Sequence, residues 1–188
     1  MKTFAGSAIA QKVTFESITP KNAKWFLLSG ATDPPSNIAI SRRSRDYRSE
    51  KNGDFLKGMD LDFFNMVDKI GKCNVKLWNK VMDLHLEKND AKRKIKQFFH
   101  DCQKYNHKPM LYYSGHGEIG TGDWCFHDGT LSIREIHNMV PTGCIPPSII
   151  SDACYSGHWS NYCVEEKLYG FQCLSACPEF SSALDSGK

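Results

Sequence analysis

A histidine and a cysteine of this chain each follow a short apolar run. His116 lies in Tyr-Tyr-Ser-Gly-His-Gly at 112–117, and Cys154 lies in Ser-Asp-Ala-Cys-Tyr-Ser-Gly at 151–157. Both runs are expected to be buried strands, and the carboxyl ends of parallel strands are where α/β proteins bind ligands. A cysteine becomes a nucleophile when a neighbouring base or positive charge favours its thiolate. The two motifs therefore suggest a cysteine peptidase.

The glycines around the histidine add a second feature of such a site. Glycine allows the backbone to approach a ligand closely, so the amide of Gly117 could face a developing oxyanion. The amide of Cys154 would be the second donor of this oxyanion hole. His116 would keep the Cys154 thiol activated and then protonate the leaving amine.

Length and composition favour one domain with a real core. The chain has 188 residues, 24% of them charged, and a net charge of +3, which is too small to imply a nucleic-acid partner. The basic clusters 42–51 and 92–96 are most simply a basic loop and a solvated helix face, with an acidic partner as the alternative. The sequence shows no secretory signal and no apolar run of membrane-spanning length.

Eight cysteines could form disulfides, but their context favours a reduced, cytoplasmic protein. No Cys-x-x-Cys pair is present, and His158 and Cys163 lack partners at zinc-site spacing, so no metal is expected. The sequence requires no cofactor. Calcium activation stays open, although acidic residues near the site show no EF-hand spacing; these are Glu118, Asp123 and Asp128.

Apolar periodicity predicts strands that alternate with helices. Strands are expected at 24–31, 75–78, 109–113, 148–152 and 170–175. Helices are expected at 56–70, from an Asn89 cap to 105, at 131–140 and at 158–168, with a surface hairpin within 118–130. This alternation predicts an α/β three-layer sandwich with a mostly parallel sheet flanked by helices. Residues 1–23 are expected to be an N-terminal extension, and residues 24–188 the domain.

These motifs resemble the caspase and metacaspase superfamily of cysteine peptidases. The segments that carry the resemblance are 114–117 and 152–157, with further likeness at Gly-Met-Asp-Leu-Asp (58–62) and at 174–177 and 182–185. The resemblance implies a caspase-like domain with His116 and Cys154 as its catalytic dyad and Gly117 at its oxyanion hole. It also implies regulated proteolysis, linked to cell death, stress or defence.

The residue two positions before the nucleophile bears on specificity. Caspases usually have glutamine there, whereas this chain has Asp152, as metacaspases do. Negative charge near the primary specificity pocket favours Arg or Lys before the cut. By the same resemblance, Asp62 is a second acidic residue of that pocket. Aspartate specificity is disfavoured but open: Leu56 replaces the caspase arginine, and Arg48 could substitute.

The chain departs from the family pattern in two places. About fifteen residues separate Cys154 from the next strand, so activity without cleavage of a linker is expected. The chain also ends before the family's final strand, which would leave a sheet edge open for a homodimer or heterodimer. An alternative function is therefore a catalytically weak, caspase-like module that regulates an active homologue. A flavodoxin-like binding protein is a third reading, but segment 29–33 lacks the glycine pattern of a phosphate loop.

Overall fold

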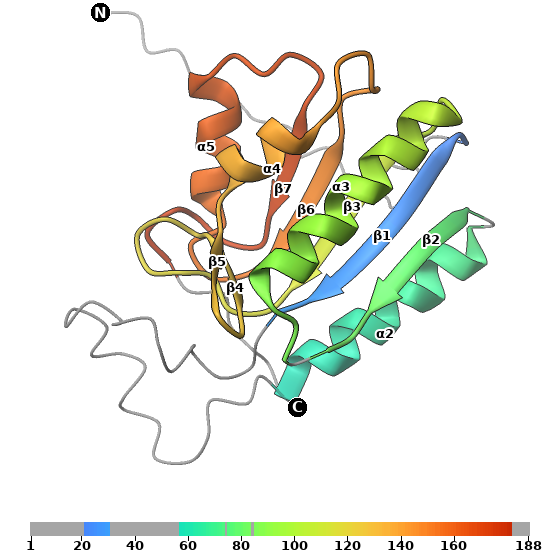
Figure 1. Cartoon of the computed structure of the whole chain (residues 1–188). Coiled ribbons are helices and arrows are strands. Elements are labelled where there is room, and N and C mark those ends of the chain that lie inside the picture. The colour runs from blue at the N-terminus through green and yellow to red at the C-terminus, as the bar shows by residue number, and fades with distance from the viewer. Residues whose placement is uncertain (1–20, 31–56, 74, 84, 182–188) are drawn as a thin grey trace, which may run out of the picture.

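The computed structural model describes residues 21–30, 57–73, 75–83 and 85–181. In chain order these form β1 (Ala23–Ser29), α2 (Lys57–Lys72), β2 (Lys76–Val81), α3 (Lys88–Lys104), β3 (Lys108–Ser114), β4 (Trp124–Phe126), β5 (Gly129–Leu131), α4 (Ile133–Met139), β6 (Ser148–Asp152), α5 (Gly157–Glu165) and β7 (Gln172–Ser175). Five strands make one parallel sheet in the order β2-β1-β3-β6-β7, and β4 pairs with β5 in a separate antiparallel hairpin. Figure 1 shows this arrangement.

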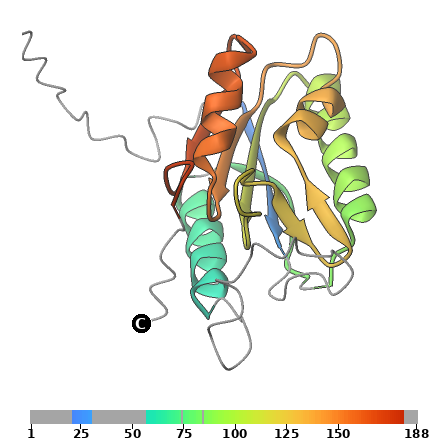
Figure 2. The same ribbon diagram turned by 90° about the vertical axis from the view of Figure 1, so that its left-hand side faces the viewer.

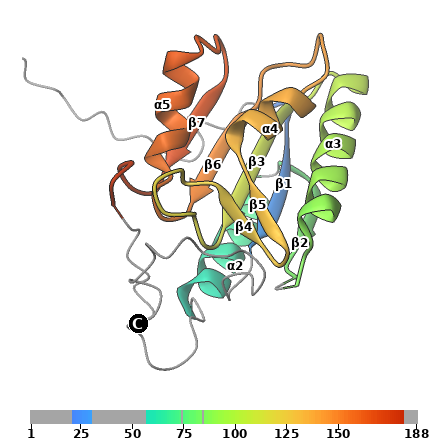
Figure 3. The ribbon, with the colours of Figure 1, turned by 60° about the vertical axis from the view of Figure 1, so that its left-hand side comes forward.

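Helices flank the sheet on both faces, which is compatible with a three-layer sandwich. Helix α2 lies on one face and α3 on the other (Figure 2). Helix α4 and the β4–β5 hairpin lie between α3 and α5 on the α3 side (Figure 3). The predicted α/β class with a parallel sheet is therefore confirmed.

Alternation along the strands divides the core into two clusters. Trp25, Leu27, Met110 and Tyr112 face α2, whereas their neighbours in β1 and β3 face α3 and the hairpin. Because successive side chains of a strand point to opposite faces, one run of apolar residues contributes to both clusters. The strand expected at 75–78 is found at Lys76–Val81, and the last strand begins at Gln172.

The predicted Asn89 cap of α3 is wrong. The N-cap residue is Glu87, two residues earlier, and it makes no capping hydrogen bond through its side chain. The Lys88 amide instead donates to Asp128 Oδ1 at 2.5 Å. A carboxylate from the turn of the hairpin thus satisfies an amide in the first turn of α3, a contact that local sequence cannot reveal.

The predicted surface hairpin is present, but its first strand lies in the core. Trp124 and Phe126 are fully buried, and Cys125 is nearly so, because the hairpin packs on the α3 side of the sheet. No helix in the described part of the chain is long and apolar enough to cross a membrane. Residues 1–20, which make up most of the predicted extension, and the basic cluster 42–51 lie outside the described residues.

Candidate functional site

His116 follows β3 in a loop that is fixed by its backbone. The Gly115 amide donates to the Asp152 carbonyl at 3.2 Å, and the Cys125 amide donates to the His116 carbonyl at 3.1 Å. The Tyr113 hydroxyl lies 2.8 Å from the same His116 oxygen. The loop is thus tied both to the end of β6 and to the hairpin. His116 itself is 6% exposed.

Cys154 lies in the turn between β6 and α5 and is half-buried. The next residue, Tyr155, has a φ of 56°, a left-handed conformation that is rare for a residue other than glycine. The Tyr155 amide donates to the Ser181 carbonyl at 2.8 Å. Such outliers cluster at functional sites, where the surrounding structure holds the strained backbone in place.

Two glycines bring the segment after β3 against the Cys154 turn. A Cβ added to Gly117 would lie 2.0 Å from the Cys154 carbonyl oxygen, and one added to Gly122 would lie 2.3 Å from the Tyr155 oxygen. Gly122 also has a φ of 67°, which favours glycine. The two motifs that the sequence singled out therefore meet through their backbones. The predicted roles of His116, Cys154 and the two oxyanion-hole amides stay predictions.

A stack of aromatic rings supports both loops from the α3 side of the sheet. The Tyr113 and Trp124 rings stack at a centroid distance of 4.4 Å, and Trp124 stacks on Trp159 of α5 at 4.4 Å. Trp124 Nε1 donates to Ser151 Oγ at 2.8 Å, and Trp159 Nε1 donates to the Gly122 carbonyl at 2.7 Å. Sequence reasoning missed this stack. Its only signal was three large aromatic residues within or beside the two motifs.

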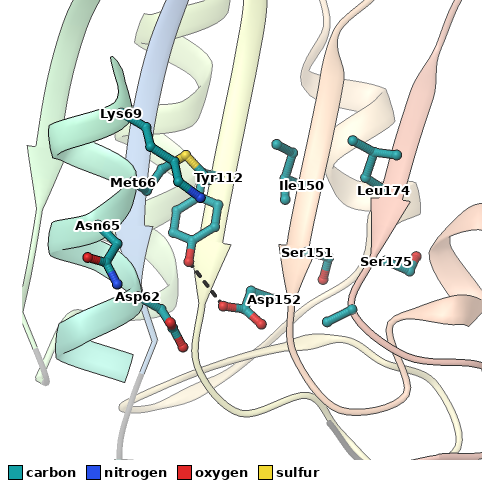
Figure 4. A pocket seen from close by; sticks show the side chains of 11 residues that line it. Asp62, Asn65, Met66, Lys69, Tyr112, Ile150, Ser151, Asp152, Leu174 and Ser175 are labelled. Carbon is teal, nitrogen blue, oxygen red and sulfur yellow. Dashed lines mark hydrogen bonds between the residues drawn. The ribbon is translucent and has the colours of Figure 1, made fainter. Parts of the chain in front are cut away.

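A pocket of about 310 Å³ opens on the α2 face, next to the end of β6 (Figure 4). Helix α2 contributes one wall and the ends of β6 and β7 contribute the other; the lining residues are Asp62, Asn65, Met66, Lys69, Tyr112, Ile150, Ser151, Asp152, Leu174, Ser175 and Ala176. Asp62 and Asp152, both expected in a substrate pocket, thus line the same cavity. His116 and Cys154 are not among its lining residues, but Asp152 lies two residues before Cys154.

Asp152 is held by two hydroxyl groups of β3. Tyr112 Oη donates to Asp152 Oδ2 at 3.0 Å, and Ser114 Oγ lies 3.4 Å from the same oxygen. The parallel register explains both contacts, because Ser114 pairs with Asp152 and Tyr112 lies two residues earlier on the same face. The sequence predicted the carboxylate but not its partners.

The two carboxylates lie toward the same end of the pocket, and Lys69 of α2 enters toward the other end (Figure 4). Asp62 and Lys69 lie seven residues apart on α2, so they share one face of the helix. Asp62 is exposed, whereas Asp152 is half-buried. The acidic end can attract a cation, and the half-buried carboxylate would interact with it more strongly than the exposed one.

Burial affects the thiols of five of the eight cysteines. It raises the pKa of Cys102 and Cys163 to about 12 and that of Cys173 to about 11, and it also raises the pKa of Cys125 and Cys144. Thiols with such pKa values contain little thiolate at neutral pH and react slowly. None of the eight cysteines is in a disulfide.

The described residues include no group of three or more His, Cys, Asp or Glu side chains that could hold a metal ion. Asp128, considered above for calcium, is instead engaged by the first turn of α3. Asp123 is half-buried, and this burial, with the charges of Glu118 and Glu135, raises its pKa to about 6. Calcium activation therefore stays an untested expectation.

Comparisons of the chain with protein-family models, with curated proteins and with solved structures found no match. Leu56 and Arg48, which bear on aspartate specificity, lie outside the described residues.

Proposed function

We propose that this chain is a cysteine endopeptidase of the caspase/metacaspase type, which uses His116 and Cys154 and cleaves after arginine or lysine. The observation that carries the proposal is that Asp62 and Asp152 line the same pocket. Asp152 lies only two residues before Cys154 in the sequence. By the resemblance, its role is regulated proteolysis in cell death, stress or defence, in the cytoplasm.

The contact between the two loops supports the catalytic pair. Gly117, next to His116, packs against the carbonyl of Cys154, so an imidazole and a thiol are carried by two segments in contact. In the proposed reaction His116 accepts the thiol proton, and Cys154 Sγ attacks the substrate carbonyl carbon. The oxyanion is stabilised by the Gly117 and Cys154 amides. His116 then protonates the leaving amine, and water hydrolyses the thioester to release the carboxylate and regenerate the thiol.

The pocket supports basic specificity. An arginine or lysine side chain that enters it would meet Asp62 and Asp152 at one end and the apolar side chains of Met66 and Ile150 along its stem. Charge-assisted hydrogen bonds to carboxylates are roughly twice as strong as neutral ones. At the acidic end a substrate aspartate would be repelled by both carboxylates, whereas Lys69 lies toward the other end of the pocket.

The experiment compares reporter peptides that differ only in the residue before the cut, arginine, lysine or aspartate, with and without calcium. We expect cleavage of the arginine and lysine reporters and a loss of at least ~1,000-fold in Cys154→Ala, since removing a catalytic nucleophile has effects of this size or larger. Cleavage after aspartate would overturn the specificity. Equal, negligible rates for both proteins with every reporter would overturn the enzyme itself.

The edge strand β7 favours the second candidate, a caspase-like module that regulates an active homologue. In the described sheet β7 has a neighbour on one side, β6, and its Leu174 is 44% exposed. An edge of this kind can pair with another chain as a homodimer or heterodimer. Light scattering across a concentration series, alone and with an active homologue, tests this. A monomer under all conditions would count against it.

A further inference from the structure

Tyr112 lies where the core meets the proposed specificity pocket. Its side chain is 3% exposed and packs in the cluster between α2 and the sheet. The ring is therefore fixed by its surroundings, and the hydroxyl at its tip lies on the pocket wall beside Asp152 (Figure 4). A buried ring with a polar tip is well suited to position a polar neighbour, because it has few rotamers to lose.

The hydroxyl of Tyr112 donates to Asp152 Oδ2 at 3.0 Å, whereas that of Ser114 lies 3.4 Å from the same oxygen. Both donors belong to β3, so the rigid sheet determines where this oxygen lies. An ionised carboxylate accepts hydrogen bonds and donates none, so it must rotate to suit these donors. The contact thereby restricts the rotation of the Asp152 side chain.

Tyr112 keeps its proton under all ordinary conditions. Burial first, and then the charge of Asp152, raises the pKa of the Tyr112 hydroxyl far above its usual value. The hydroxyl is therefore a permanent neutral donor, and it adds no charge that would compete with a basic ligand. Its contribution is purely geometric.

We infer that Tyr112 is a positioning residue, whose hydroxyl fixes the Asp152 carboxylate for a planar guanidinium and so makes the pocket prefer arginine to lysine. The inference rests on the proposed function and deepens its specificity. A guanidinium binds a carboxylate through two parallel hydrogen bonds, which require a defined orientation of the carboxylate plane. An ammonium behaves as a point charge and tolerates a rotated carboxylate.

The test uses Tyr112→Phe, which keeps the ring and removes only the donor. The matched control is Tyr105→Phe, at the exposed end of α3. Binding of agmatine, a guanidinium, and of cadaverine, an ammonium, is measured by calorimetry, together with cleavage of the arginine and lysine reporters. We expect Tyr112→Phe to weaken agmatine binding roughly 10-fold and cadaverine binding less than about 3-fold, since hydrogen bonds to charged groups are among the stronger ones.

Ser114→Ala serves as a second, milder variant in case Tyr112→Phe unfolds. Its affinity for agmatine should lie between those of the wild type and Tyr112→Phe. Equal losses for agmatine and cadaverine, or no loss, would overturn the positioning role and leave the peptidase proposal intact. A selective loss of agmatine binding in a protein that cleaves nothing would support the role and refute the peptidase. A wild-type protein that binds neither amine would refute both the basic pocket and the role of Tyr112.

Discussion

The two carboxylates of the pocket differ in their burial. Asp152 is half-buried and is held by hydroxyls from the neighbouring strand, whereas Asp62 is exposed on a helix. Exposed ion pairs contribute about 0–1 kcal/mol, and loss of one partner of a desolvated pair costs about 2–5 kcal/mol. The two residues should therefore contribute unequally to recognition of a basic side chain.

We predict that Asp152→Asn lowers kcat/KM for the arginine reporter about 30-fold or more, and that Asp62→Asn lowers it less than about 5-fold, as these free energies imply. Steady-state kinetics on both variants measures the difference. The control is the alkylation rate of Cys154 by iodoacetamide, which needs no pocket and should not change. A larger effect at Asp62 would show that recognition occurs at the pocket mouth.

Asp123 gives a prediction on stability. Its pKa in the folded state, about 6, exceeds the ordinary value of 3.8 because the carboxyl is buried and lies near Glu118. The folded state therefore holds this proton more tightly than the unfolded chain does. As pH rises from about 4 through about 6, ionisation of Asp123 should destabilise the fold.

We expect Asp123→Asn to be more stable than wild type at pH 8, by about 1–3 kcal/mol, with the difference vanishing near pH 4. Urea unfolding at the two pH values measures this. Asp68→Asn, an exposed change on α2, should show no such gain. Equal or lower stability of Asp123→Asn at pH 8 would mean that the charged carboxylate is well accommodated.

At the scale of elements, α4 is a short helix with a complete capping box. Ser132 Oγ accepts from the Glu135 amide at 3.2 Å, and Glu135 Oε2 accepts from the Ser132 amide at 3.1 Å. Lys88 and Lys92 of α3 also contact Glu135. Burial opposes ionisation of Glu135, but these hydrogen bonds outweigh it and lower its pKa to about 2. The cap thus links α4 to α3.

Loss of the cap should be measurable in unfolding experiments. Ser132→Ala removes the acceptor for the Glu135 amide and should lower the free energy of unfolding by about 1 kcal/mol. Ser132→Thr keeps a hydroxyl and should lower the free energy of unfolding much less. If both substitutions had the same small effect, the N-terminus of α4 would not depend on this side chain.

The contact between the two loops gives a prediction that bears on catalysis. A Cβ at position 117 would overlap the Cys154 carbonyl, whereas one at Gly71 of α2 would meet nothing within 4 Å. Gly117→Ala must therefore push the His116 loop away from the Cys154 turn. We expect at least ~100-fold lower kcat/KM, since small displacements in an active site can cost that much. Gly71→Ala should leave activity unchanged, and a fully active Gly117→Ala would contradict the site.

The spacing of apolar residues, and the residues that end each apolar run, predicted the strands and helices around the sheet well. The strand predicted at 148–152 matches β6 residue for residue, and α2 and β3 lie close to their predicted bounds. Contacts made across the fold were not predictable. Three of them depend on segments that lie far apart in the sequence. They are the cap of α3 by Asp128, the burial of Trp124 and the hydrogen bond from Tyr112 to Asp152.

At the scale of the whole molecule, topology alone does not distinguish the candidate classes. The sheet order β2-β1-β3-β6-β7 equals the 2-1-3-4-5 order of flavodoxin-like folds, which bind ligands where β1 and β3 diverge. In this chain Gly30, the residue that follows β1, packs closely against β3. A Cβ on Gly30 would lie 2.0 Å from the Tyr113 hydroxyl. The pocket lies instead beside β6, next to the cysteine motif.

The most direct measurement uses an acyloxymethyl ketone probe that carries arginine, followed by mapping of the modified residue by mass spectrometry. The chain has eight cysteines, and burial raises the pKa of five of them. The identity of the modified cysteine therefore distinguishes the proposed nucleophile from the other thiols. We predict that the probe modifies Cys154, that agmatine slows the reaction, and that the matched aspartate probe reacts at least ~30-fold more slowly. Labelling spread over several cysteines, or faster labelling by the aspartate probe, would contradict a basic-selective peptidase centred on Cys154.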